Sequence, residues 1–233
     1  MKIRNLSTTS IELLTQVFNT AFKIYYVPIN FTIEGMRFRI QRGRIDLRLS
    51  VGAFEDNELV AFMLSGVDNW QGQPTIYNAG TGVIPTFRGQ QLVDQMYEWA
   101  IPLWREEGYT QATLEVIVEN ERAIRAYRRV GMQIHRKLIS LKSPALIKQS
   151  AAGSTTTLCQ EVDRPDWGQY STLQSFDPSW DFCQAGVEAV LSSCRYFEWR
   201  AKDASYLQAF AIINGKSQIA QAGVSSELKG GWA

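Results

Sequence analysis

The chain has 233 residues, and its 24 Lys and Arg against 23 Asp and Glu leave a formal net charge of +1. Apolar residues make up 45% of the sequence, which excludes a disordered chain, and the balanced charge gives no global reason to bind nucleic acid or an anionic membrane. No window approaches the roughly 20 consecutive apolar residues of a membrane helix, and the start has no apolar signal segment, so we expect a cytoplasmic protein.

The cysteines and the single histidine restrict the chemistry. Cys159, Cys183 and Cys194 contain no Cys-x-x-Cys pair, and His135 is the sole histidine. These counts favour neither a disulfide framework nor a metal site, and we assign His135 no role. A general acid or general base in this protein is therefore expected to be a carboxylate, Tyr or Lys side chain.

The first part of the chain alternates strand and helix signals. Thr9 and Glu12 have the capping-box spacing, which predicts a helix start at Thr9. Pro102 predicts a bend in a long helix, and Gly131 predicts the left-handed end of the next. In chain order we expect a strand at 2–6, helices at 9–25 and 32–42, strands at 47–54, 59–67 and 75–83, a helix at 88–107, a strand at 111–118, a helix at 121–130 and a strand at 133–141.

Residues 143–157 are rich in small and polar side chains, which predicts a linker between domains at 1–142 and 158–233. In the second part we expect a helix from Asp166 and another with Asp177 as N-cap and Pro178 in its first position. The expected strands there are 158–162, 194–201, 206–213 and 218–224, the last two joined at a turn through Asn214 and Gly215.

The second part repeats the first. Leu59-Val60-Ala61-Phe62 has a counterpart in Leu207-Gln208-Ala209-Phe210, Gly82-Val83 in Gly223-Val224, and Arg88-Gly89 in Lys229-Gly230. The order strand, two helices, three strands also recurs. We interpret the second part as a diverged, incomplete copy, which docks on the first domain or forms a homodimer through its unpaired last strand.

The segment from Gly82 to Leu92 carries the first functional signal. A strand enters a turn that opens a long helix, and the free N–H groups of a helix start suit a phosphate. Gly89 allows close approach of the backbone, and Arg88 adds a positive charge. Taken alone, a solvated strand-to-helix turn is the better interpretation.

A second segment, 114–131, changes that balance. Together the two segments resemble the GNAT superfamily of acyl-CoA-dependent N-acyltransferases, whose pattern is Val-x-Pro-x-x-Arg-Gly before a helix, then a strand, Asn-x-x-Ala, a helical Tyr and a closing Gly. The matching residues are Val83, Pro85, Arg88, Gly89, Asn120, Ala123, Tyr127 and Gly131. The resemblance implies an α+β fold, with a mixed, mostly antiparallel sheet flanked by helices and its fourth and fifth strands splayed, plus a second, partial unit of the same kind.

The resemblance also implies a cofactor and its site. The acyl donor would be acetyl-CoA, and the sequence departs from the family where Gln91 and Val93 replace the usual small residues. The residues that would bind acetyl-CoA are Thr81, Gly82, Val83, Arg88, Gly89, Gln90, Gln91, Leu92, Val93, Asn120 and Tyr127.

Within the superfamily, the Leu-Glu-Val strand and the Asn and Tyr after it resemble the ribosomal-protein N-terminal-alanine acetyltransferases. That likeness implies Glu115 as the base that takes a proton from the acceptor ammonium, and Tyr127 as the acid that protonates the CoA thiolate. Asn120 would hold the pantetheine end of the cofactor. From the residues alone, Glu115 also fits a solvent-facing strand position and Tyr127 a core position.

We therefore expect an N-acetyltransferase that moves an acetyl group to a primary amine, either a small molecule or a peptide N-terminus. The alternative is a non-catalytic acyl-CoA-binding or interaction module, which Gln91, Val93 and the incomplete second copy favour. A run of arginines beside the expected acceptor cleft could attract an anionic group of the acceptor, although a solvated helix face explains it more simply. The run consists of Arg37, Arg39, Arg42, Arg44 and Arg48.

Overall fold

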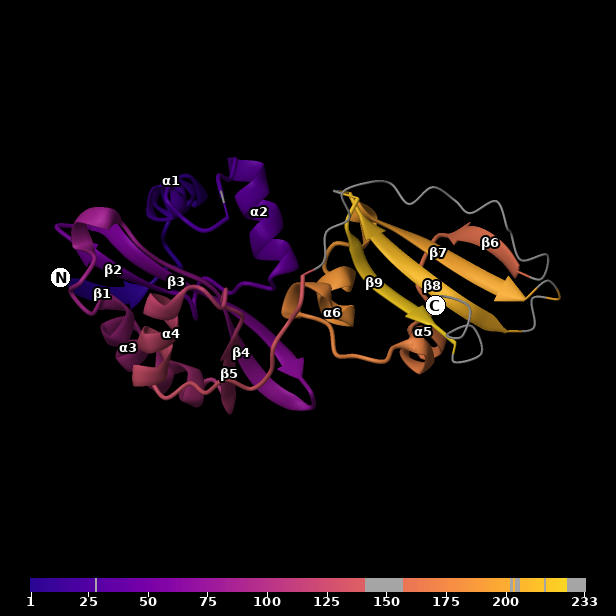
Figure 1. Ribbon diagram of the computed structural model, residues 1–233. Coiled ribbons are helices and arrows are strands. Elements are labelled where there is room, and N and C mark those ends of the chain that lie inside the picture. Colours follow the sequence, from indigo (N-terminus) through magenta and orange to yellow (C-terminus); the bar gives the residue numbers. More distant parts are fainter. Residues whose placement is uncertain (28, 141–156, 202, 204–205, 216, 226–233) are drawn as a thin grey trace. The chain divides into compact units, whose positions relative to one another are not determined.

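The structure is a computed structural model that describes the chain except for residues 28, 141–156, 202, 204–205, 216 and 226–233. The chain divides into two compact units, Met1–His135 and Arg136–Ala233 (Figure 1). Two predicted features lie outside the described residues: the linker, apart from Thr157, and the Lys229-Gly230 turn.

The N-terminal unit is a five-stranded sheet flanked by helices, as the sequence predicted. The strand order is β1-β2-β3-β4-β5, and all pairs are antiparallel except β4 with β5, which run parallel. The elements are β1 (Lys2–Asn5), α1 (Ile11–Phe22), α2 (Ile33–Arg42), β2 (Val51–Glu55), β3 (Glu58–Trp70), β4 (Gln73–Val83), the 3-10 helix η1 (Pro85–Phe87), α3 (Leu92–Glu106), β5 (Gln111–Leu114) and α4 (Glu121–Arg129).

Helix ends follow local capping chemistry. Thr32 caps α2 by accepting the Gly35 N–H, as predicted. The predicted start at Thr9 is wrong by one residue, because the Ser10 hydroxyl accepts the Leu13 N–H and α1 begins after it.

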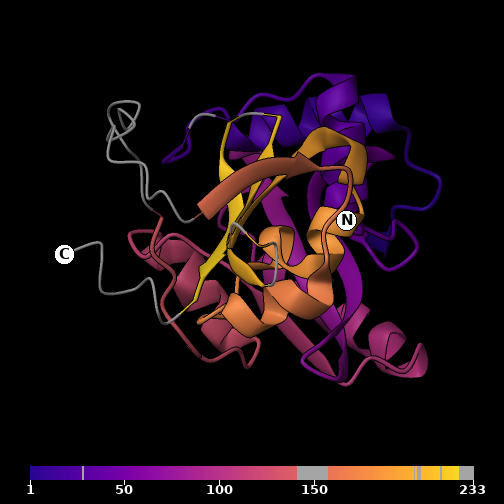
Figure 2. The ribbon, with the colours of Figure 1, turned by 90° about the vertical axis from the view of Figure 1, so that its right-hand side faces the viewer.

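Helices α1 and α2 cover one face of this sheet, and α3 and α4 cover the other (Figures 1 and 2). Alternate residues of β3 point to opposite faces. Phe62 stacks on Phe18 of α1 with ring centroids 5.2 Å apart, whereas Met63 joins a core cluster with Met96 and Tyr97 of α3. The hydrophobic effect thus holds helices on both sides of the central strand.

A β-bulge separates β4 from β5. Leu64 pairs with Gly80 and Ser65 pairs with Asn78, so that Ala79 is the extra residue. The parallel ladder to β5 ends at the pair of Asn78 with Leu114. From Gly80 onward β4 has no β5 neighbour, which agrees with the splayed strands that the resemblance implied.

Three predicted boundaries in this unit are wrong. The strand expected at 111–118 ends at Leu114, because the bulge turns β4 away from it. The helix expected from residue 88 starts at Leu92, after a 3-10 turn. Residues 133–140 form no strand and leave Ile134 and Ile139 exposed, since an alternating pattern becomes a strand only where a neighbouring strand pairs with it.

The C-terminal unit is a four-stranded antiparallel sheet in the order β6-β7-β8-β9. Asp166 caps α5 by accepting the Gln169 N–H, as predicted. The elements are β6 (Thr157–Val162), α5 (Trp167–Leu173), the 3-10 helices η2 (Trp180–Phe182) and η3 (Leu191–Ser193), α6 (Gln184–Glu188), β7 (Cys194–Ala201), β8 (Leu207–Asn214) and β9 (Ile219–Val224).

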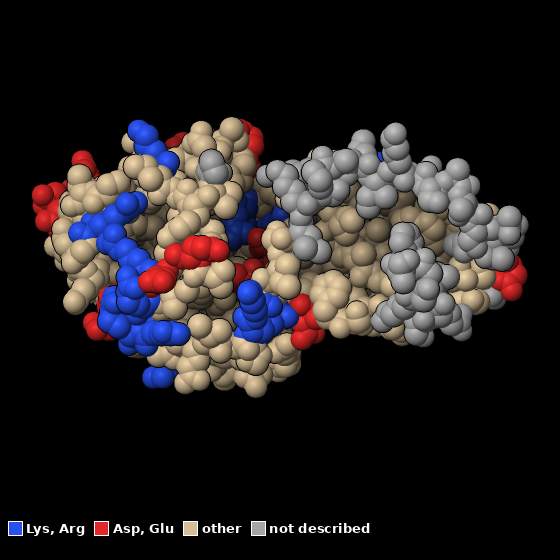
Figure 3. All heavy atoms as spheres, viewed as in Figure 1, with Lys and Arg blue, Asp and Glu red and all other residues tan. Residues whose placement is uncertain are grey.

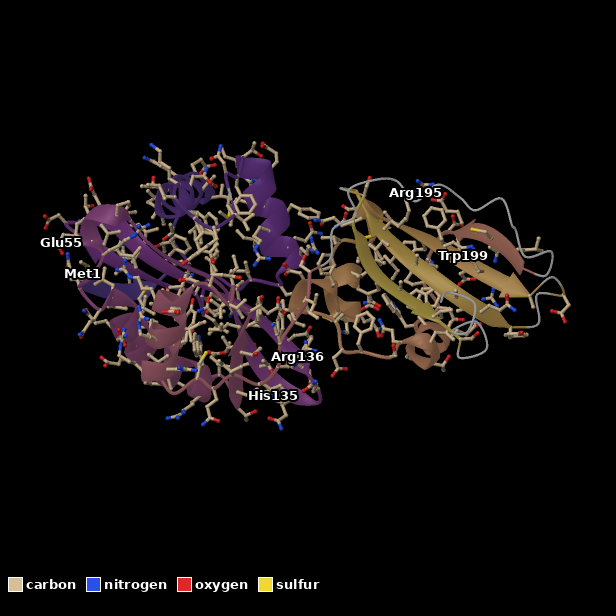
Figure 4. All side chains as sticks on the ribbon, viewed as in Figure 1. Met1, Glu55, His135, Arg136, Arg195 and Trp199 are labelled. Atoms are coloured by element: carbon tan, nitrogen blue, oxygen red, sulfur yellow. The ribbon has the colours of Figure 1, made fainter. Side chains whose placement is uncertain are left out.

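The helix predicted from Asp177 is wrong. The guanidinium of Arg136, a residue labelled in Figure 4, donates to the Asp177 carbonyl at 2.7 Å and to the Pro178 carbonyl at 2.8 Å. Those carbonyls would be the first acceptors of a helix starting there. The next α-helix starts only at Gln184.

The two sheets share one strand register. Ala61 pairs with Val83 and Phe62 with Gly82 in the N-terminal unit, and the pairs Ala209–Val224 and Phe210–Gly223 repeat this in the C-terminal unit. Two pairs further on, both sheets have a bulge, with Ala79 and Ala220 as the extra residues. The pairing of the preceding strand is irregular at the same point in both units. The irregularity lies between Ala53 and Phe54 in the β2–β3 pair and between Trp199 and Arg200 in the β7–β8 pair.

The packing around the paired glycines also repeats. A Cβ on Gly82 would lie 2.6 Å from the Phe62 ring, and one on Gly223 would lie 2.5 Å from the Phe210 ring. Tyr170 of α5 stacks on Phe210 at 4.0 Å, where Phe18 of α1 stacks on Phe62. In each unit a helical aromatic side chain covers a strand phenylalanine, and only glycine fits beneath it.

None of the helices in the described parts of the chain is both long and apolar enough to cross a bilayer. Over the same residues, His, Cys, Asp and Glu side chains nowhere gather in groups of three or more that could hold a metal ion.

Candidate active site

The turn between β4 and α3 presents main-chain N–H groups. Gly89 and Gln91 have left-handed backbone, with φ of 87° and 57°, and α3 then starts at Leu92. A Cβ on Gly89 would have no atom within 4 Å, so that the backbone is open there. The first intrahelical bond comes from Gln95 to the Gln91 carbonyl, and the N–H groups before it, with the helix dipole, favour an anion.

Gln91 occupies a position that favours glycine. Its positive φ costs an ordinary residue about 1 kcal/mol or more. The side chain does not cap the helix. The left-handed backbone gives a physical reason why a small residue is usual here in the family that the sequence resembles.

Arg88 contacts the protein's own backbone. Its Nε donates to the Val83 carbonyl at 3.2 Å, and a terminal nitrogen donates to the Ala21 carbonyl at 2.9 Å. These bonds join the turn to the ends of β4 and α1. Arg88, which the sequence predicts to bind the cofactor, therefore also stabilises the fold.

Helix α4 is joined to the start of α3 by an ion pair. Arg129 binds both carboxylate oxygens of Asp94 at 2.8 and 2.9 Å, and this contact holds the pKa of Asp94 below its usual value. Arg125 pairs with Glu121, whereas Arg122 and Arg128 are exposed and form no ion pair within the described residues. Lys and Arg side chains gather over this part of the unit in Figure 3.

The arginine run near α2 is also largely engaged. Arg44 pairs with Asp68 at 3.0 Å and Arg48 with Asp46 at 2.7 Å. Arg39 donates to the carbonyl of Ala79, the bulge residue, at 2.6 Å. That bond fixes α2 against the point where β4 leaves β5.

Glu115 and Asn120 follow the end of β5. Glu115 is the first residue after Leu114 and is exposed. Asn120 caps α4 by accepting the Ala123 N–H at 3.2 Å, and it donates to the Tyr25 hydroxyl at 3.4 Å. Both residues thus lie beyond the last β4–β5 pair.

Tyr127 projects from α4 toward the open stretch of β4. Its ring packs edge to face against that of Tyr97, with centroids 6.3 Å apart, and its phenol lies near the side chains of Thr81 and Asn78. Burial raises the pKa of Tyr127 above its usual value near 10, and these polar neighbours offset part of that rise. The phenol is therefore protonated at neutral pH.

A loop after α1 approaches the same region. The Tyr26 hydroxyl donates to the Glu119 carbonyl at 3.0 Å, and Tyr25 contacts Asn120 as described above. Ile24, Tyr26 and Val27 are exposed, as is Val118 on the neighbouring segment. The rim next to Asn120 is consequently apolar and aromatic.

Asn78 and Tyr97 are site residues that sequence reasoning missed. Asn78 is buried at the bulge and donates to the Tyr97 hydroxyl. A signal was present, because Asn78 is an amide inside an otherwise apolar stretch, Ile76-Tyr77-Asn78-Ala79. A buried polar residue needs partners, and such a residue in a strand is a candidate for a site.

Comparisons with known proteins indicate the family of the chain. The sequence profile described as the Acetyltransferase (GNAT) family matches residues 13–132, just over half of the chain. No curated protein matches the sequence.

Solved structures with a similar fold are acetyltransferases of low identity. An aminoglycoside acetyltransferase from an uncultured soil metagenomic sample, in complex with sisomicin, is 14% identical, covers 62% of this chain and 96% of its own, and has a TM-score of 0.49. The aminoglycoside 6'-N-acetyltransferase AAC(6')-IG from Acinetobacter haemolyticus is 14% identical, covers 62% and 99%, and has a TM-score of 0.48. The NatC complex bound to Gag peptide and CoA is 19% identical, covers 58% and 87%, and has a TM-score of 0.48.

The chain belongs to the GNAT family of acetyltransferases. It is accordingly an acyltransferase, and enzymes of this family use acetyl-CoA as the acyl donor.

Proposed function

We propose that the N-terminal unit transfers the acetyl group of acetyl-CoA to a primary amine, with Glu115 as the base and Tyr127 as the acid. The observation that carries the proposal is the Tyr127 phenol beside the open stretch of β4, packed against Tyr97 and kept protonated by burial. Glu115 lies at the end of β5, where the sheet opens.

The residues around the turn fit acetyl-CoA. The open backbone at Gly89 and the free N–H groups from Leu92 suit its diphosphate, and the exposed Arg122 and Arg128 suit further phosphate charge. When bound, acetyl-CoA supplies an activated acetyl thioester. The full set of proposed contacts is Thr81, Gly82, Val83, Arg88, Gly89, Gln90, Gln91, Leu92, Val93, Asn120 and Tyr127.

Glu115 would remove the proton that keeps the acceptor amine from attacking the thioester. A lysine-like amine has a pKa near 10.4 and is almost fully protonated at neutral pH, whereas an α-amine has a pKa of about 7.7–8.0. A carboxylate removes the proton from an α-amine far more easily, either directly or through water. The proposed base therefore favours a peptide N-terminus or another amine of low pKa over a lysine-like amine.

Tyr127 provides the proton that the leaving thiolate needs. A thiol has a pKa near 8.5, so that a phenol of raised pKa transfers its proton only within a close, well-oriented hydrogen bond. The edge-to-face packing of Tyr127 against the buried Tyr97 ring supports such orientation.

A specific observation favours a second candidate function, a non-catalytic acyl-CoA-binding module. Gln91 has a strained backbone in the turn, and its side chain together with that of Val93 stands where the family usually has small residues. In this case acetyl-CoA binds, but no amine is acetylated.

The substitution Tyr127→Phe separates the two candidates. Acetyl transfer to a panel of peptides and small amines, followed as thiol release, should fall about 100-fold or more, because a general acid contributes about 10²–10⁴. The dissociation constant of acetyl-CoA, measured by calorimetry, should stay within about threefold. Equal turnover in the variant and the parent chain would contradict the role of Tyr127, and binding without turnover in the parent chain would favour the binding module.

For the C-terminal unit we propose an incomplete, non-catalytic copy of the GNAT fold, with domains at 1–142 and 158–233 and a linker at 143–157. The shared register and bulge positions support this. In the N-terminal unit, β4 continues past the bulge from Asn78 back to Gln73 and carries β5 there. Strand β9 begins at Ile219, the position that matches Asn78, and so lacks the stretch on which a fifth strand pairs.

The outer edge of β9 pairs with no strand in the described residues. Open strand edges tend to find a partner, and we propose a homodimer formed through this edge as one way to cover it. Light scattering of the full chain measures its mass. A mass of one chain across a concentration series would contradict the homodimer.

A further inference from the structure

Asn78 lies at the point where the sheet opens. It is the last β4 residue paired with β5, and it directly precedes the bulge residue Ala79. Its side chain is buried, so each polar atom of that side chain needs a partner inside the protein.

All of the polar atoms of Asn78 find partners. Its Nδ2 donates to the Thr81 hydroxyl and to the Tyr97 hydroxyl, each at 2.7 Å. Its Oδ1 accepts from the Gly80 N–H at 3.1 Å and from the Thr81 hydroxyl at 3.0 Å. The amide is therefore held in one orientation.

Tyr97 anchors this cluster to α3. It is 1% exposed, and its ring contacts Trp104 and Tyr127 edge to face, with centroids 5.9 and 6.3 Å apart. Its position is fixed by the core. A rigid phenol thus fixes Asn78, Asn78 fixes Thr81, and the Tyr97 ring of the same cluster packs against the Tyr127 ring.

The C-terminal unit shows that this cluster is not needed to build the sheet. In the shared register, Ile219 stands in the position of Asn78 and Ala222 in that of Thr81. The same bulge forms there, between Ile212 and Ile213. A bulge at this place therefore requires neither the amide nor the hydroxyl, although burying them demands a full set of hydrogen bonds.

We propose that Asn78, Thr81 and Tyr97 are positioning residues, which hold the Tyr127 phenol in the orientation that proton transfer to the leaving thiolate requires. This inference rests on the proposed function, since it needs Tyr127 as the acid. It gives the Thr81 side chain a task apart from the cofactor contact that the family resemblance implies. Small errors in the placement of a reacting group cost large factors in rate.

The substitution Thr81→Val tests the proposal, because it removes the hydroxyl and keeps the branched shape. We expect kcat to fall about 10–100-fold, within the range that a general acid contributes, while the KM for acetyl-CoA changes by less than about threefold. Thr81→Ser restores the hydroxyl and should recover kcat to within about threefold. Tyr97→Phe, which acts only through Asn78, should lower kcat about 3–10-fold.

Thr75→Val is the matched control. Thr75 is a fully buried threonine of the same strand whose hydroxyl donates to the Gln73 carbonyl and accepts from Gln111, outside this cluster. We expect it to leave kcat within about twofold of the parent chain. A loss in Thr75→Val equal to that in Thr81→Val would show a general effect of burial and overturn the proposal.

A double-mutant cycle separates failure of this inference from failure of the proposed function. If Thr81 acts through Tyr127, Thr81→Val adds no further loss to kcat in the Tyr127→Phe background. If Tyr127→Phe lowers kcat but Thr81→Val raises only KM, the inference fails and the acid role remains. If Tyr127→Phe leaves kcat unchanged, the acid role fails and the inference fails with it.

Discussion

At the scale of single residues, the candidate site depends on two effects. One is the left-handed backbone conformation of residues in the turn, and the other is burial, which keeps a phenol protonated. Gln91 and Gly89 show the first of these effects, since both have a positive φ in the turn that precedes α3. Tyr127 shows the second.

Gln91→Gly should tighten acetyl-CoA binding. Glycine adopts the left-handed backbone without the penalty of a side chain, and it clears space at the turn. We expect the dissociation constant to fall about threefold to tenfold, equivalent to about 1 kcal/mol. Calorimetry measures it, and Gln71→Gly, which relieves the same left-handed backbone in the β3–β4 turn (φ of 52°), is the control. Weaker binding in Gln91→Gly would show that the glutamine side chain helps to hold the cofactor.

Tyr196 should make the stability of the C-terminal unit sensitive to alkaline pH. Burial raises the pKa of Tyr196 to about 12, from a usual value near 10. Because the folded pKa is raised, its contribution is complete below about pH 10 and is lost as the pH rises through about 12. Urea unfolding measures the free energy of unfolding, and Tyr196→Phe should make it depend less on pH between pH 10 and 12. Tyr206→Phe, at an exposed tyrosine, should leave that pH dependence unchanged. An unchanged slope in Tyr196→Phe would contradict this.

At the scale of elements, the bulge in β4 is the feature that positions the site. It ends the ladder to β5, places Glu115 after the last pair and opens β4 from Gly80 onward. Arg39 holds the bulge from α2, and the Asp94–Arg129 ion pair holds α4 against the start of α3.

The glycines opposite Phe62 and Phe210 should be essential to their own units. In Gly82→Ala the new Cβ meets the Phe62 ring and Ala21, and in Gly223→Ala it meets the Phe210 ring and the Leu173 carbonyl. We expect each to cost about 1–3 kcal/mol, as overpacking does. Hydrogen exchange resolved along the chain should show faster exchange in β4 for the first variant and in β9 for the second.

Gly80→Ala is the control for this pair of substitutions. Its Cβ would lie 3.6 Å from the Phe18 ring, an ordinary contact, and its φ is not positive. Exchange in β4 should stay as slow as in the parent chain. If Gly80→Ala and Gly82→Ala accelerate exchange equally, the close contact with Phe62 is not the cause.

At the scale of the whole molecule, the chain joins a GNAT unit to a unit with the same sheet register, which we propose to be a non-catalytic copy. Ile219 and Ala222 replace Asn78 and Thr81 in register. Strand β9 also begins at Ile219, next to the bulge, and pairs with no fifth strand within the described residues. We therefore propose that the N-terminal unit alone carries the site.

The full chain should therefore bind one acetyl-CoA. Calorimetry of the intact chain gives the stoichiometry directly, and the predicted value is one molecule per chain. Binding of two molecules per chain would contradict a non-catalytic C-terminal unit. So would residual acetyl transfer in Tyr127→Phe, if a second substitution in the N-terminal unit does not remove it.

The sequence by itself determined much of this protein. Local signals are sufficient wherever one residue acts on its own neighbours: helices follow Thr32 and Asp166 as predicted, each capped by that side chain, and Gly131 closes α4 with a φ of 92°. The spacing from Val83 to Gly131 also indicated the family, because that spacing records the order of strand, turn and helix.

Only the tertiary structure decided what depends on partners far apart in the chain. The end of β5 at Leu114 follows from a bulge in β4, and the missing helix at Asp177 follows from Arg136. The cluster of Asn78, Thr81, Tyr97 and Tyr127 joins a strand and two helices. A hydrogen bond between distant residues leaves no periodic trace in the sequence, so that folding alone brings such a site together.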